Sequence, residues 1–209
     1  KKVYMDDTVW KYDNTQYWIN GAYYYFAAVA PFTGRKWALQ ENGSTMEGTN
    51  LSFTNDGTQD VVYAQTEAII GDESRTTAVG FTFRHILSKV KFSFANNYNA
   101  ENTKLRVENI QITNPHEKAD VALKKSSTVW GNWSTTTQNF SLDFGNATAD
   151  NDNATTADSF NYGEEVESYK QLLLIPADYT STKLAISFTY TIIVNGVDIK
   201  TFTETPTVS

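Results

Sequence analysis

The chain has 209 residues, a formal net charge of −7 at pH 7 and no cysteine. The acidic balance argues against non-specific binding to nucleic acid, which needs a basic face to neutralise phosphates. No apolar run approaches the roughly 18 residues that a membrane-spanning helix needs. Aromatic residues make up 14% of the chain, and helix-favouring runs are scarce. Because aromatic and β-branched residues favour strands, we expect an all-β fold.

The first part of the chain predicts short strands separated by turns. One aromatic, apolar run ends at Pro31, with a turn expected at Thr33-Gly34. An alternating segment ends at Asn55-Asp56-Gly57, which is a strong turn signal. The strands expected here are residues 22–31, 51–54 and 60–64.

Residues 71–77 show one of the clearest shifts in composition, because they are polar throughout. We therefore predict two domains, an N-terminal domain over residues 1–77 and a C-terminal domain over residues 78–209. The chain opens within strand-like sequence, so the N-terminal domain is expected to lack its first strands.

Residues 81–94, FTFRHILSKVKFSF, alternate like a strand but change phase in the middle. A β-bulge or a crossover at residues 86–89 would explain the slip, because one extra residue redirects the faces of a strand. His85 is then expected to be partly buried and, with Ser88, to bond unpaired backbone groups. The first layer would hold Phe83 and Leu87, and the second would hold Val90, Phe92 and Phe94.

The second half of the chain predicts further strands. Residues 104–114 slip by one position in the same way, which predicts another bulge. Residues 145–159 lack periodicity and are expected to form a long exposed loop, and residues 172–176 predict a strand buried on both faces. Residues 184–194 alternate without a break up to Asn195-Gly196, the preferred pair for a two-residue hairpin. That turn would set Val194 opposite Val197 and Ile192 opposite Ile199.

Catalytic and metal-binding motifs are scarce, so we predict no enzyme activity, no catalytic residue, no cofactor and no metal. His116 lies in NPHEKAD, which resembles the zinc motif HExxH only superficially, because Asp120 takes the last position and Pro115 precedes the histidine. A Ser-His-Asp triad has no supporting nucleophile motif. Residues 150–153 could bind Ca²⁺ but lack the glycine and glutamate of an EF-hand, so a solvated loop is the preferred interpretation.

Two tryptophans leave an alternative open. Trp130 and Trp133 either pack in a core or between domains, or form a platform on which a sugar stacks.

Several segments together resemble the fimbrillin-like (Mfa-like) family. Residues 81–94 resemble the signature with which the second domain of these proteins begins. Residues 15–18 with 23–31, residues 60–66 and residues 172–179 resemble further family passages in the same order. The signature positions are Phe83, His85, Leu87, Ser88, Lys89, Val90 and Phe92.

The resemblance implies two transthyretin-like β-sandwich domains with Greek-key-type antiparallel sheets. It also implies export as a lipoprotein precursor to the outer membrane of Gram-negative anaerobes, and a role as stalk, anchor or tip subunit of type V pili that support adhesion. In this family an N-terminal strand is removed by proteolysis, and a strand of the neighbouring pilin subunit takes its place, which is donor-strand exchange. The membrane would be reached only through a lipid anchor, whose cysteine this chain lacks.

The alternative is a surface-exposed module that binds a glycan or a host protein and does not polymerise.

Overall fold

The computed structural model describes residues 3–14, 16–31, 38–42, 45–135, 139–142, 159–167, 171–177, 179 and 183–208. Within these residues every regular element is a β-strand and every strand pair is antiparallel, which confirms the predicted all-β class. The described residues contain no helix that is long and apolar enough to cross a membrane. The assignment to two transthyretin-like domains with Greek-key-type sheets stays a prediction.

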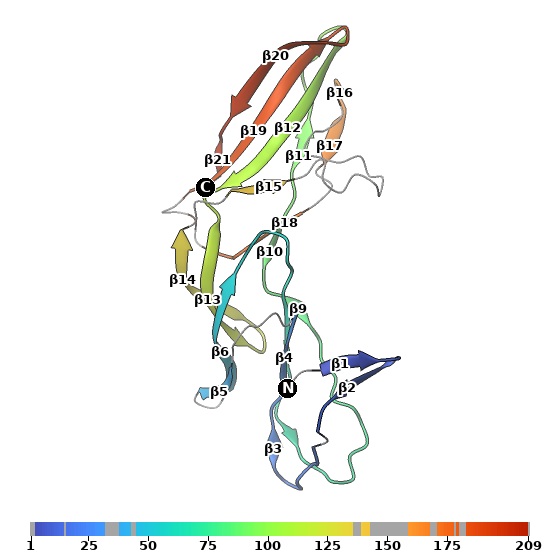
Figure 1. Cartoon of the computed structure of the whole chain (residues 1–209), viewed down its shortest axis with the longest axis vertical. Coiled ribbons are helices and arrows are strands. Elements are labelled where there is room, and N and C mark those ends of the chain that lie inside the picture. Colours follow the sequence, from blue (N-terminus) through green and yellow to red (C-terminus); the bar gives the residue numbers. More distant parts are fainter. Residues whose placement is uncertain are drawn as a thin grey trace.

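The molecule is elongated, and strands that are distant in the sequence, such as β6 and β13 or β12 and β19, lie side by side in it (Figure 1). In chain order they are β1 (Val3–Asp6), β2 (Val9–Tyr12), β3 (Tyr23–Tyr24), β4 (Ala27–Ala30), β5 (Ala38–Asn42), β6 (Thr45–Thr54), β7 (Val62–Gln65), β8 (Ile69–Ile70), β9 (Arg84–His85), β10 (Ser88–Val90), β11 (Ser93–Ala95), β12 (Thr103–Thr113), β13 (His116–Lys124), β14 (Thr128–Thr135), β15 (Phe140–Leu142), β16 (Phe160–Asn161), β17 (Glu165–Glu167), β18 (Leu172–Leu174), β19 (Leu184–Val194), β20 (Val197–Glu204) and β21 (Thr207–Val208).

A first sandwich surrounds the cluster that we call core 1. One layer is the four-stranded sheet β14-β13-β6-β5, and the other is the three-stranded sheet β4-β7-β9. The two layers pack because β13 turns alternate apolar side chains inward, where they meet Phe53 of β6 and Tyr63 of β7. The buried members of core 1 are Phe53, Val61, Tyr63, Ile86, Leu87, Ala119, Val121, Leu123 and Ile175.

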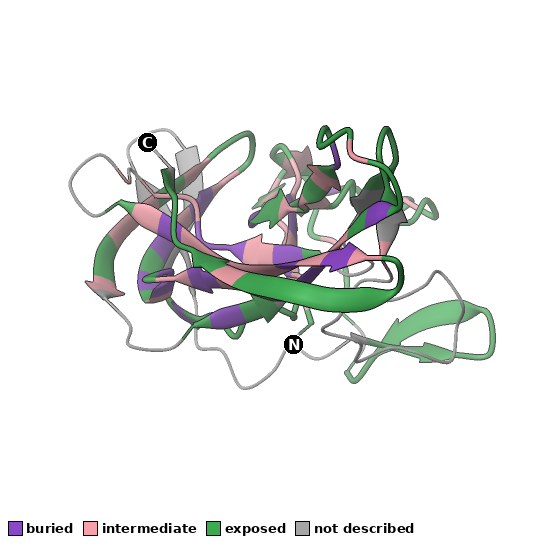
Figure 2. Ribbon diagram, turned by 90° about the horizontal axis from the view of Figure 1, so that it is seen from above, coloured by how far each residue is buried: buried purple, intermediate pink, exposed green. Residues whose placement is uncertain are grey.

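A second cluster, core 2, lies under the sheet β15-β12-β19-β20, to which β16 and β21 also pair. The opposite layer consists of two separate ribbons, β10–β18 and β11–β17. The buried members of core 2 are Val107, Ile110, Ile112, Phe140, Leu172 and Leu174. Figure 2 shows the buried positions alternating along the long strands.

Two short segments connect the cores, residues 87–90 and residues 172–175. They pair with each other through β10 and β18. On the first segment Leu87 belongs to core 1, whereas Val90 packs against core 2. The phase slip within residues 81–94 therefore marks a crossover, as predicted. On the second segment Leu172 and Leu174 belong to core 2 and Ile175 belongs to core 1, which confirms a strand buried on both faces.

The first sandwich combines strands from both sides of residue 77. β13 pairs with β6 over a register that includes Asp120 opposite Ser52, although β13 falls within the predicted C-terminal domain. The polar residues 71–77 contain no strand. The division into residues 1–77 and 78–209 stays a prediction.

The structure tests three local predictions. The bulge in β12 is confirmed: Glu108 pairs with Thr189 but Gln111 pairs with Ser187, so one extra residue lies between. The hairpin β19–β20 and its pair Val194 with Val197 are confirmed, and positive φ at Asn195 (49°) and Gly196 (79°) matches a type I′ turn. The pair Ile192 with Ile199 is wrong, because a register shift sets Ile192 opposite Lys200.

The early segments also agree in outline. The run 22–31 contains β3 and β4 and ends at Pro31, and the segment 51–54 is the end of the longer strand β6. The predicted turn at residues 33–34, the loop up to residue 158 and the acidic run 150–153 lie outside the described residues.

Candidate functional site

The first candidate surface is the layer that covers core 2 with two ribbons, β10–β18 and β11–β17. Each of β10, β11, β17 and β18 is only three residues long. Within the described part of the chain each ribbon contains just two strands, so no third strand joins it there, although on β18 the N–H and the carbonyl oxygen of Leu173 are bonded to Gly57 and Asn55. Three partly buried apolar side chains of this layer's chain segment pack on core 2, namely Val90, Phe92 and Phe94, and from the opposite sheet they face Leu105 of β12 and Leu184, Ile186, Phe188 and Tyr190 of β19. This surface has the chemistry to take up an extended strand with alternating apolar side chains.

The outer strand β20 is a second open edge. Among the described strands it pairs only with β19, and nearly all of its residues are exposed. Arg106 of β12 holds it in place across β19, since Nη2 of Arg106 lies 2.7 Å from Oδ2 of Asp198. Hydrogen bonds from Arg106 lower the pKa of Asp198. The edge of β20 is therefore available, whereas the strand itself is held to the sheet.

The family-signature residues lie along the connection between the cores. Leu87 is in core 1, Ser88 and Lys89 are exposed on β10, and Val90 and Phe92 pack against core 2. These positions form a link between two packed cores rather than a cleft.

Two signature residues depart from the prediction. Phe83 does not pack with Leu87, because its side chain is 45% exposed. His85 is not partly buried, because it lies opposite Val62 on the face that points away from Tyr63 and core 1, and its side chain is 71% exposed. Its Nδ1 lies 2.5 Å from Oδ2 of Asp60, so it contacts a side chain rather than a backbone group.

The two tryptophans of β14 have different surroundings. Trp130 is partly buried against core 1, and its ring meets Phe53 edge to face with centroids 5.9 Å apart. Trp133 is 42% exposed, and its ring centroid lies 6.2 Å from that of His116. A glycan platform at these two positions stays a prediction.

His116 opens strand β13, where it is buried and stacks on Tyr179 with ring centroids 5.1 Å apart. On a strand, His116 and Asp120 are not one helical turn apart, so the geometry that HExxH requires is missing. Burial raises the pKa of Tyr179. No group of three or more metal-ligating side chains occurs among the described residues.

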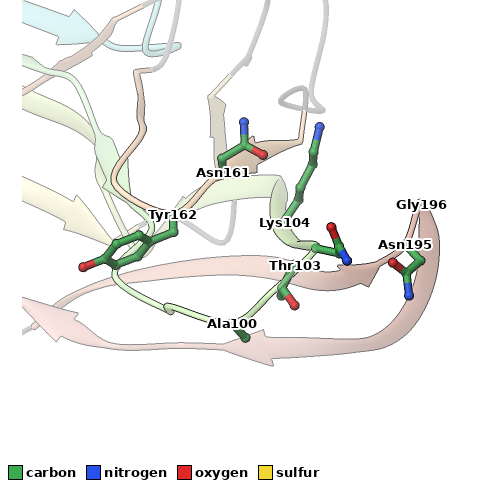
Figure 3. Close-up of a pocket in the computed structure, with 8 residues that line it drawn as sticks. Ala100, Thr103, Lys104, Asn161, Tyr162, Asn195 and Gly196 are labelled. Atoms are coloured by element: carbon green, nitrogen blue, oxygen red, sulfur yellow. The ribbon is translucent and has the colours of Figure 1, made fainter.

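Sequence analysis did not anticipate a hollow of about 410 Å³ at the far end of the core 2 sheet. Its lining residues are Ala100, Asn102, Thr103, Lys104, Asn161, Tyr162, Asn195 and Gly196. Figure 3 shows that the side chains of Lys104 and Asn161 point the same way while the ring of Tyr162 points aside. The side-chain Nδ2 of Asn161 donates a hydrogen bond of 3.0 Å to Oε1 of Glu164. The groups do not converge on a common point, so we assign no ligand to this hollow.

A comparison with family models decides the family. The model described as fimbrillin-like matches residues 1–208. The chain belongs to the fimbrillin-like family. Fimbrillin-like proteins are structural pilins rather than enzymes, so this chain is a fimbrial subunit that associates with other pilin subunits in a cell-surface appendage. A comparison with curated proteins gave no match.

For a fimbrillin-like subunit the open sheet edges matter more than any pocket. Unpaired backbone groups at an edge favour pairing with another chain. In the described part of this fimbrillin-like chain, the ribbons over core 2 combine edges that no third strand joins with partly exposed apolar side chains, whereas β20 offers an edge with mostly exposed, largely polar side chains.

Proposed function

We propose that this chain is a stalk, anchor or tip subunit that joins its neighbours by donor-strand exchange at the bacterial surface and so supports adhesion. The observation that carries the proposal is the composition of the layer over core 2, two ribbons of three-residue strands beside partly exposed apolar side chains. A strand donated by a neighbouring subunit would pair with a ribbon edge and place alternate side chains over core 2.

Apolar burial sets the scale of the expected gain. Full burial of one large apolar side chain contributes about 1.5–3 kcal/mol. A donor strand that buries three such side chains contributes about 5–9 kcal/mol before the entropy of association is subtracted. Main-chain hydrogen bonds add to this gain and fix the register of the strand.

The subunit would reach the surface as a lipoprotein precursor and become competent for exchange when an N-terminal strand is removed. The test therefore starts from the precursor, which is trimmed with an arginine- or lysine-specific protease. The products are examined on SDS gels without heating and by negative-stain microscopy. We expect filaments and a detergent-resistant ladder only after trimming.

A matched pair of variants links the ladder to core 2. Phe94 packs on core 2 and meets Phe188 edge to face at 5.0 Å, whereas Phe83 is exposed. Phe94→Ser should weaken the ladder and Phe83→Ser should leave it intact, with thermal melting of each untrimmed protein as the control for folding. A fully trimmed protein that stays monomeric would contradict donor-strand exchange. Glycan-array screening, with Trp130 and Trp133 as the first positions to replace, would then test the non-polymerising alternative.

A further inference from the structure

Residues 71–83 connect β8 to β9, and none of them belongs to a strand. Most of their side chains are exposed, and exposed connections are where proteases cut a folded protein most readily. A cut here would divide the first sandwich, because β4 to β7 come before the connection while β9, β13 and β14 follow it. The connection has one basic residue, Arg75, so it is a target for proteases that recognise arginine.

Arg75 lies against an aromatic cluster at the end of the molecule that β3 occupies in Figure 1. Its Cζ is 5.3 Å from the centroid of the Trp18 ring, which is within the range of a cation–π interaction. Trp18 in turn meets Tyr24 and Phe26 edge to face, with ring centroids 4.8 Å and 5.8 Å apart. Arg75 is partly buried, whereas its chain neighbours on both sides are exposed. The one side chain that such a protease needs is therefore drawn onto the cluster.

Hydrogen bonds tie the backbone of the connection to the segment that carries the tryptophan. The N–H of Gly21 donates a bond of 3.0 Å to the carbonyl oxygen of Gly71, and the N–H of Gly71 donates one of 2.7 Å to the carbonyl oxygen of Ala22. The N–H of Glu73 donates a bond of 2.8 Å to Oδ1 of Asn20. The part of the connection that precedes the arginine is therefore held beside the ring.

We propose that the contact of Arg75 with Trp18 is a clasp that protects the connection from proteases specific for arginine. Such a protease takes the side chain that precedes the cut bond into a pocket of its own. Arg75 must leave the ring of Trp18 before that can happen, so the rate of cleavage follows the population of the open form.

The clasp has a use in the proposed function, on which it rests only for the identity of the protease. Trimming by an arginine-specific protease removes an N-terminal strand, and the clasp keeps the same protease from dividing the first sandwich. The contact itself lies within one subunit and does not depend on polymerisation.

The other two arginines of the described residues report on the fold as a whole. Arg84 lies in β9, where its Nη2 donates a hydrogen bond of 2.7 Å to the carbonyl oxygen of Ser127. Arg106 lies in β12 and is bonded to Asp198. Both are in paired strands, so cleavage after either residue requires the sheet to open.

The test is limited proteolysis of the folded, untrimmed chain with an arginine-specific protease, and mass spectrometry locates each cut. A synthetic peptide of residues 70–80 shows how fast the bond after Arg75 is cut without the clasp. Cleavage after Arg35, which lies outside the described residues, is scored separately. We expect the folded chain to be cut after Arg75 far more slowly than the peptide.

A matched set of variants links the protection to the ring. Trp18→Ala should be cut after Arg75 about tenfold faster than the unmodified chain, as expected for the loss of an interaction in the middle of the cation–π range. Tyr17→Ala is the control and should not change the rate, because Tyr17 is 83% exposed. Trp18→Leu is a milder change that keeps apolar bulk without the ring, and it should also speed the cut. The bonds after Arg84 and Arg106 should stay intact.

Three results would overturn the proposal. The first is cleavage after Arg75 in the unmodified chain at the rate of the peptide, and the second is an unchanged rate in both tryptophan variants. The third is cleavage of all three bonds together in both variants, because the ring would then support the whole fold rather than this connection. Failure of donor-strand exchange would instead appear as the absence of a trimming-dependent ladder, with these cleavage rates unaffected.

Discussion

Asn55 provides a sharp test of how the two cores are joined. It follows β6 and is only 2% exposed. Its Nδ2 donates a hydrogen bond of 2.6 Å to the carbonyl oxygen of Leu173, and its Oδ1 accepts one of 3.0 Å from the backbone N–H of Gly57. The backbone N–H of Leu173 returns a bond of 2.8 Å to the carbonyl oxygen of Gly57. The turn after β6 is therefore bonded to β18 at the connection between core 1 and core 2.

Replacing Asn55 by alanine removes both side-chain bonds and leaves the carbonyl of Leu173 and the N–H of Gly57 without those partners. Each buried group that loses its partner costs about 1–3 kcal/mol. The free energy of unfolding should fall by about 2–6 kcal/mol for the two groups, which corresponds to a decrease in Tm of about 4–24 °C for a chain of this length. Asn139→Ala is the control, because Asn139 is exposed and its Nδ2 donates a hydrogen bond of 3.1 Å to Oε1 of Gln111, another side chain at the surface.

The assay is urea unfolding at pH 7, followed by tryptophan fluorescence, with the midpoint and the slope analysed separately. Asn55→Asp adds a second measurement: it retains an acceptor for Gly57 but turns a carboxylate oxygen toward the carbonyl of Leu173. Protonation restores a donor, so this variant should regain stability relative to the unmodified chain as the pH falls from 7 to 4. If Asn55→Ala lies within about 0.5 kcal/mol of the unmodified chain, the two bonds do not hold the connection.

Two further predictions concern local packing and alkaline pH. A Cβ at Gly71 would overlap the carbonyl oxygen of Ile19 and lie 2.7 Å from Cε2 of Tyr24, so Gly71→Ala should lower the free energy of unfolding by about 2–3 kcal/mol. Gly80→Ala is the control and should be neutral, because nothing lies within 4 Å of the added carbon. Equal melting temperatures for the two variants would refute this. Burial raises the pKa of Tyr63 to about 12 from its usual value near 10. The neutral phenol therefore stabilises the fold fully below pH 10, and this stabilisation is lost as the pH rises through 12. Between these pH values the free energy of unfolding of the unmodified chain should fall by up to about 2 kcal/mol more than that of Tyr63→Phe. Parallel curves of unfolding free energy against pH would contradict that assignment.

Much of the strand arrangement follows from short-range pattern. The bulge in β12 and the crossover between Leu87 and Val90 both appear as a one-residue slip in an alternating run, because each side chain of a strand takes the face opposite to that of its neighbour. The turn at Asn195-Gly196 sets the first pair of the hairpin for the same local reason.

Pairing between distant segments could not be predicted in this way. Alternation does not indicate that β13 joins β6, or that the strand after Asn195-Gly196 gains an extra residue before Lys200. The exposure of His85 follows from its position opposite Val62, on the face that points away from core 1, which depends on how β9 joins β7.

The sequence by itself determined the all-β class, the change of phase at residues 86–89, the main hairpin and the resemblance to the fimbrillin-like family, because these depend on residue type and on spacing within short segments. Only the tertiary structure decided what covers each apolar face. It packs Trp130 on core 1 and leaves Trp133 exposed, and it covers core 2 with three-residue strands. The physical reason is that a periodic pattern states that one face of a strand needs cover, whereas the covering element comes from long-range contacts among segments far apart in the chain.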